Sequence, residues 1–116
     1  MSNLTLTSQL AVVVALYHEQ AIEAANAEAA HKSARAKRYL RARHSGEAKS
    51  AADAEMVADA DDEVADFHSK RLITAAIADA TKQKILSLRE EIGMVRSEMA
   101  NQREADKFHS IDRSMP

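Results

Sequence analysis

Residues 85–99, with the sequence ILSLREEIGMVRSEM, place large apolar side chains at alternating steps of three and four residues. The series consists of Ile85, Leu88, Ile92, Val95 and Met99. This spacing keeps the five side chains on one stripe of an α-helix and is typical of the seam of a left-handed coiled coil. The stretch therefore predicts a long helix that packs lengthwise against a second helix.

The same frame continues towards the N-terminus, where the seam becomes small and polar. The earlier positions are Thr81, Ala78, Thr74, Arg71, Phe67 and Val64. A first long helix has a matching character, with one stripe that repeats at 11 residues and so follows a nearly straight path. That stripe is expected at Ala11, Ala15, His18, Ile22, Ala25, Ala29, Ser33, Ala36 and Leu40. Small residues in both helices let the backbones approach closely, which favours an antiparallel helical hairpin.

Few residues in this chain can stop a helix, because it has only two glycines and a single, terminal proline. Gly46 follows a basic segment and suits the left-handed conformation of a helix C-cap. Ser50 and Asp53 resemble a capping box, which predicts a short acidic helix between the two long ones. We expect one helical domain over residues 1–116. Its elements are helices over about 8–44, 51–58 and 62–106 and a frayed tail over 110–116.

The composition indicates that one chain is not enough for a stable core. Alanine supplies much of the apolar fraction and aromatic residues only 3%, so the area buried per residue is small. Apolar side chains also surround most of the first helix near its start, whereas one partner helix covers only one side. We therefore expect a homodimer or a higher homo-oligomeric bundle, with a thick monomer core as the alternative. The expected interface comprises Leu10, Val13, Val14, Tyr17, Ile85, Leu88, Ile92, Val95 and Met99.

Charge is distributed unevenly along the chain. Residues 29–46 contain basic side chains and no acidic ones, and residues 50–69 contain seven acidic side chains and no lysine or arginine. The basic set is Lys32, Arg35, Lys37, Arg38, Arg41 and Arg43. This set predicts a contact for nucleic acid or for an acidic partner, since Lys and Arg can neutralise phosphates along a backbone. The alternative is that the acidic connector folds back beside the basic segment and masks it.

Signatures of catalysis and of cofactor binding are missing from the sequence. The chain has no cysteine, and its five histidines are scattered. Glu28 and His31 have the spacing of a di-iron bundle, but the predicted seam lacks the further inward carboxylates that such a site needs. The apolar run from Leu10 to Tyr17 is far shorter than a membrane span of about 20 residues. We expect a cytoplasmic protein that is not an enzyme, with no cofactor, no metal and no membrane partner.

Four segments carry a resemblance to a known class of proteins. They are Tyr39 to Arg43, the connector over 49–55, the Asp-rich restart that follows it, and the helix over 88–103. In texture the chain resembles the small Ala-, Glu- and Arg-rich helical coiled-coil accessory proteins of bacteriophages and prophages. The resemblance implies a non-enzymatic factor that binds a host or phage protein. Alternatives are a DNA-binding accessory factor without sequence specificity and a component of virion assembly or scaffolding.

Overall fold

The computed structural model describes residues 5–114 and contains three helices and no strand within that range. The helices are α1 (Leu6–Ser45), α2 (Ala51–Ala60) and α3 (Asp62–Ser114). The all-α class predicted from the sequence is confirmed, as is the packing of two long helices against each other. The third helix runs on to Ser114, several residues beyond its expected end near Asp106.

Each helix begins or ends where a side chain or a glycine satisfies the free backbone groups. Thr5 Oγ1 accepts from the Ser8 amide at 3.1 Å, and Ser50 Oγ accepts from the Asp53 amide at the same distance. Asp61 Oδ1 accepts from the Val64 amide at 3.1 Å at the start of α3. Gly46 closes α1 with a positive φ of 78°. The side-chain caps satisfy amides that the helix itself leaves without a partner.

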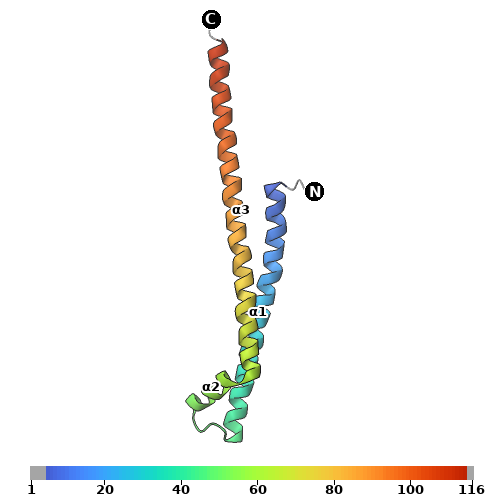
Figure 1. The fold of residues 1–116 in the computed structure, drawn as a ribbon, viewed down its shortest axis with the longest axis vertical. Helices are drawn as coiled ribbons and strands as arrows, with labels where there is room; N and C mark the ends of the chain where they lie inside the picture. Colours follow the sequence, from blue (N-terminus) through green and yellow to red (C-terminus); the bar gives the residue numbers. More distant parts are fainter. Residues whose placement is uncertain (1–4, 115–116) are drawn as a thin grey trace.

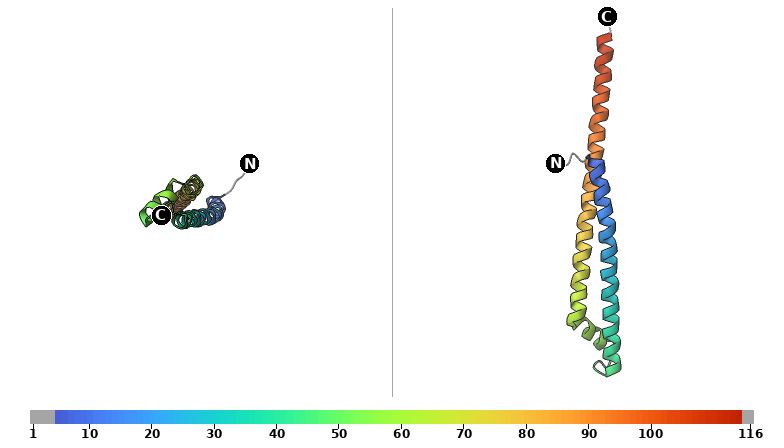
Figure 2. Two further views of the ribbon diagram at one scale, coloured as in Figure 1. Left: turned by 90° about the horizontal axis from the view of Figure 1, so that it is seen from below. Right: turned by 90° about the vertical axis from the view of Figure 1, so that its right-hand side faces the viewer.

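The two long helices lie side by side and run in opposite directions (Figure 1). Val13 of α1 packs with Ile85 and Leu88 of α3, whereas His31 faces His68, so residue numbers rise along one helix as they fall along the other. The short helix α2 closes the hairpin at its bend (Figure 2). The result is a rod with principal extents of 98 × 31 × 14 Å.

Burial along α3 follows the predicted seam from Val64 to Ile92. Every position of that seam is buried or half-buried. At its bulky end, Ile85 and Leu88 form an apolar cluster with Val13. In its narrow middle, Thr81 donates a hydrogen bond to the Gln20 side chain, and Thr74 Oγ1 donates to the Lys70 carbonyl at 2.9 Å. The two threonines of the seam are therefore tolerated, because each hydroxyl has an acceptor.

The stripe expected on the first helix is wrong, because all nine of its residues are exposed. The face that packs against α3 repeats at steps of three and four residues instead. It comprises Leu6, Leu10, Val13, Tyr17, Gln20, Ala24, Ala27, His31, Ala34 and Arg38, all buried or half-buried. Two helices that pack along their whole shared length must have seams of the same period, so α1 adopts the seven-residue repeat of α3.

Candidate functional site

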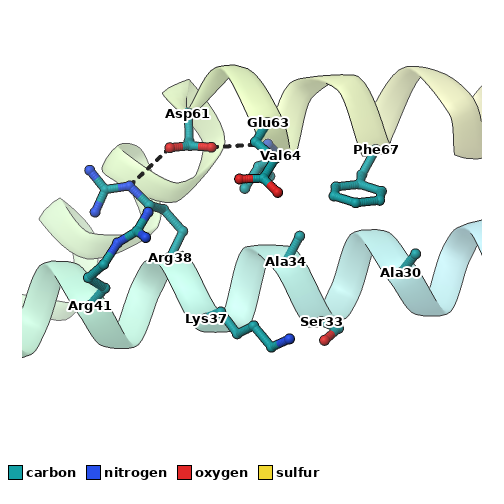
Figure 3. Close-up of a pocket in the computed structure, with 10 residues that line it drawn as sticks. All are labelled: Ala30, Ser33, Ala34, Lys37, Arg38, Arg41, Asp61, Glu63, Val64 and Phe67. Atoms are coloured by element: carbon teal, nitrogen blue, oxygen red, sulfur yellow. Dashed lines mark hydrogen bonds and ion pairs between the residues drawn. The ribbon is translucent and has the colours of Figure 1, made fainter.

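Arg38 joins the end of α1 to the start of α3 at the bend of the hairpin. Its Nη2 lies 2.7 and 2.8 Å from the two carboxylate oxygens of Glu47, and its Nε lies 3.0 Å from Asp61 Oδ2. Figure 3 shows the Asp61 carboxylate between this guanidinium and the Val64 backbone. The Val64 amide and Arg38 together lower the pKa of Asp61, and the Arg38 hydrogen bond lowers the pKa of Glu47.

A second ion pair links α1 to the end of α2. Arg35 donates to both carboxylate oxygens of Asp59, at 2.8 and 3.3 Å. The hydrogen bond from Arg35 lowers the pKa of Asp59, so this carboxylate stays ionised to more acidic pH than usual. The acidic connector therefore folds back onto the basic segment, as one of the two hypotheses from the sequence expected. It neutralises Arg35 and Arg38, which are only two of the six basic residues.

The remaining basic residues divide into one local pair and an unpaired group. Lys32 lies 3.3 Å from Glu28, one turn away on the same helix. Lys37, Arg41 and Arg43 are exposed and make no ion pair with any described side chain. The sequence thus located a basic surface, but the structure leaves only half of it available to a partner.

A groove of about 460 Å³ lies between α1 and α3 beside the Arg38 junction. Ala30 and Ala34 face Val64 and Phe67 across its narrow part (Figure 3). Its basic wall comes from Lys37, Arg38 and Arg41 and its acidic wall from Asp61 and Glu63. Of these five charged residues, only Arg38 and Asp61 are paired with each other across the groove.

A layer of basic side chains crosses the hairpin where the seam is polar. The rings of His31 and His68 lie 5.0 Å apart, and Arg71 Nη2 lies 3.0 Å from His68 Nδ1. Since a guanidinium can only donate, His68 Nδ1 is the acceptor in this contact. Arg71 Nε is buried and has no hydrogen-bond partner among the described residues. Burial and the charge of Arg71 lower the pKa of His31.

Sequence reasoning missed this layer because the stripe expected to pack on the first helix did not include His31. Glu28 is exposed, but His31 is half-buried. The signal that finds it is the seven-residue spacing of Tyr17, Ala24, His31 and Arg38, which puts the histidine on the packed face.

Seven of the nine residues predicted as an oligomer interface belong to the core of the single chain. Leu10, Val14 and Tyr17 pack around the cluster of Val13, Ile85 and Leu88. Ile92 is half-buried near the start of α1. Whether these residues also contact a second chain stays a prediction. The last two, Val95 and Met99, are 41% and 56% exposed, because α1 does not reach them.

The last part of α3, residues 93–114, extends beyond α1 and is here named the α3 extension (Figure 1). It spans about 20 residues, or roughly 30 Å at 1.5 Å per residue. Every residue of it with a described side chain, 93–108, is exposed. The seam nevertheless continues into it through Val95 and Met99. The α3 extension is therefore a helix with an apolar stripe and no packing partner within the described part of its own chain.

The described residues offer little for chemistry at either place. No group of three or more His, Asp or Glu side chains among them could hold a metal ion. None of the helices, as far as they are described, combines the length and apolarity needed to cross a membrane. Comparison of the chain with known protein families, with curated proteins and with solved structures found no match.

Proposed function

We propose that the protein acts without catalysis, as a helical rod that binds another protein through the α3 extension. The observation that carries this proposal is the continuation of the packed seam, through Val95 and Met99, past the end of the helix that covers it. This mode of action is also the one implied by the resemblance to phage accessory proteins.

The energetics of a lone helix favour a partner at this place. The α3 extension continues a packed helix but has no packing of its own in the described part of the chain, and most helical stability in proteins comes from tertiary packing. The α3 extension has Gly93 at its start, which weakens it by a further ~1 kcal/mol relative to alanine. A partner helix on the seam would cover Val95 and Met99 and order the extension. Such recognition reads side chains at steps of three and four residues.

The hairpin part of the rod supports this role by being stiff. The Arg38 junction fixes the bend, since one guanidinium holds carboxylates from the loop and from the start of α3. The Arg35 pair with Asp59 attaches α2 to α1. The hairpin would hold the α3 extension at one end of a 98 Å molecule and the exposed basic residues at the other.

Site-specific photo-crosslinking in the host that produces the protein tests this function. A photoreactive residue at Val95 should give covalent adducts with another polypeptide, and the same residue at Ser69 should not. Ser69 is the matched control because it is an exposed position of the same helix within the hairpin. Equal adduct yields at the two positions, or no adduct at Val95, would contradict the proposal.

A second candidate function is binding of nucleic acid without sequence specificity. Its support is the group of Lys37, Arg41 and Arg43, which is exposed and forms no ion pair with an acidic side chain in the described part of the chain. If these three contact phosphates of a DNA duplex, the logarithm of the binding constant should fall with the logarithm of salt with a slope of roughly −2 to −3. Fluorescence anisotropy with labelled DNA, and with a Lys37→Gln, Arg41→Gln variant, measures that slope. Binding that the variant does not weaken would exclude this surface.

A further inference from the structure

We propose that the helix that covers the α3 extension is the α3 extension of a second copy, aligned in parallel and in register. This inference rests on the proposed function, because it names the partner for the same surface. It follows from how apolar and charged residues are ordered along the extension, together with the place where α1 ends.

The apolar residues of the exposed seam lie at one end of the extension. In the seven-residue frame, with core positions a and d, Ile92 and Met99 are at a and Val95 is at d. The next core positions are polar, with Gln102 at d and Asp106 at a. Parallel pairing in register puts Val95 against Val95 and Met99 against Met99 of the second copy. The two Asp106 carboxylates would face each other and so limit the paired segment at its distal end.

Antiparallel pairing would not bring these apolar residues together. Each α1 already occupies the seam as far as Ile92. Two antiparallel extensions could therefore pair only through residues after Ile92. The first residues of one extension would then lie beside the last residues of the other. Val95 would then lie against the polar distal part of the partner, near Asp106. The order of residues along the seam thus favours the parallel arrangement.

Charges beside the seam select the same orientation. Arg89, Arg96 and Arg103 occupy successive e positions, and Glu91 and Glu98 occupy successive g positions. In a parallel pair, a g residue meets the e residue five positions further along the other chain. Within the extension, Glu98 then faces Arg103 of the other chain, twice over by symmetry, and the same rule would pair Glu91 with Arg96 where the extension begins.

In an antiparallel pair, by contrast, e positions meet e positions, so arginine would face arginine. Among the described residues of one chain, none of these charges forms an ion pair. Neither Glu98 nor Arg103 makes an ion pair with another described side chain.

The parallel arrangement has a consequence for the rest of the rod. Both hairpins point the same way from the paired extensions, so the two bends, with Lys37, Arg41 and Arg43 on each, lie at the same end of the dimer. Exposed Val12 and Leu16 lie on α1 near the level where the second copy arrives. They become the next apolar residues available for contact between the two hairpins.

Sedimentation velocity of the full chain over a concentration series measures the association. Met99→Asp should raise the dissociation constant of the dimer at least 100-fold, since it puts two carboxylates at a core position. Met94→Asp is the matched control, because Met94 is equally a methionine of the extension, is 64% exposed, and lies at position c, away from the seam. It should change the constant less than about 3-fold. A monomer at all concentrations, or equal effects of the two variants, would overturn the inference.

Oxidative crosslinking determines the relative orientation of the two extensions. Because the sequence contains no cysteine, only the introduced residue can form a disulfide. Val95→Cys should form a disulfide with its counterpart in the second copy, and Ser97→Cys, at the outward position f, should not. A dimer that Val95→Cys fails to link would be antiparallel or out of register, contrary to the proposal. The photo-crosslinking described above distinguishes failure of this inference from failure of the proposed function. Adducts at Val95 with a mass other than twice the chain would refute the second copy as partner and leave the binding function intact.

Reversal of the flanking charges gives an independent check. Glu98→Arg places arginine opposite Arg103 of the second copy and should weaken the dimer about 10-fold or more. The double variant Glu98→Arg, Arg103→Glu restores opposite charges in a parallel pair and should recover the original affinity. No recovery in the double variant would contradict the parallel alignment.

Discussion

Replacing one alanine on the packed face of α1 with leucine tests which side of this helix carries the hairpin. Ala27 is 5% exposed, and the register set by the Gln20–Thr81 and His31–His68 contacts places it at about the level of Thr74, which is 8% exposed. Leucine adds three carbon atoms where there is no room, and overpacking of this kind costs about 1 to 3 kcal/mol. The intrinsic helix propensity of leucine is close to that of alanine, so propensity does not account for the loss.

The matched control is Ala29→Leu, only two residues away. Ala29 is exposed, although the sequence placed it on the buried stripe. A leucine there should change the free energy of unfolding by less than about 0.5 kcal/mol, as is usual for surface substitutions.

Urea unfolding, followed by circular dichroism at low protein concentration, measures both variants against the parent chain. The linear dependence of the unfolding free energy on urea gives the difference in stability, provided that the slope stays constant. Ala27→Leu should be less stable by about 1 to 3 kcal/mol. If Ala29→Leu is instead the destabilised variant, the stripe read from the sequence is the packed face and the register described above is refuted.

The structure also predicts the direction of the stability change for three further perturbations. Burial and Arg71 lower the pKa of His31, so the unfolded chain binds more protons below about pH 6.5 and stability should fall as pH drops from 7 towards 5. In His31→Gln that slope should be shallower, and an unchanged slope in thermal melts would contradict the role of His31. Gly46→Ala should destabilise by about 1 to 2 kcal/mol, since alanine is strained at a φ of 78° and nothing else lies within 4 Å. Gly93→Ala should stabilise by up to about 1 kcal/mol, because Gly93 is helical with open space around it. The melting temperature should therefore fall in Gly46→Ala and rise in Gly93→Ala, and a shift in the same direction in both would contradict these two predictions.

The seam of α3 could be predicted from the sequence, because the large apolar residues near its C-terminal end are compatible with only one heptad frame. Ile85, Leu88 and Ile92 fix the phase of the helix, and the same phase then predicts that Thr74 and Thr81 face the partner helix. The all-α class and the breaks between helices were predictable for a related reason. Gly46 suits the end of α1 because glycine adopts a positive φ easily, and the Ser50 side chain caps the start of α2.

The packed face of α1 could not be read in the same way. Alanine occurs on every side of this helix, so the positions of the alanines do not distinguish the packed face from the exposed face. The 11-residue stripe rested mainly on alanines, whereas the true face is marked by Leu6, Leu10, Val13 and Tyr17 in its first turns. Imposing the period of α3 on α1 would have recovered it, since both helices share one seam.

The charge pattern predicted the ion pairs but not their extent. A basic segment followed by an acidic connector indicated that the two would meet, as Arg35 and Arg38 do with Asp59 and Asp61. Which basic residues remain exposed depends on the angle at which α2 closes the bend, and that angle is set by packing around Ala42, Ala48 and Ala54. Nothing in the spacing of the charges specifies it.

Hydrogen exchange of the amides of the α3 extension, measured over a range of protein concentrations, tests most directly the claim that this segment pairs with a helix of another chain. Amides over 95–108 should exchange fast in dilute protein, because a lone helix opens easily. They should become protected as the concentration rises through the dissociation constant, while the hairpin amides stay protected throughout. Fast exchange at every concentration, or protection that does not depend on concentration, would contradict the claim.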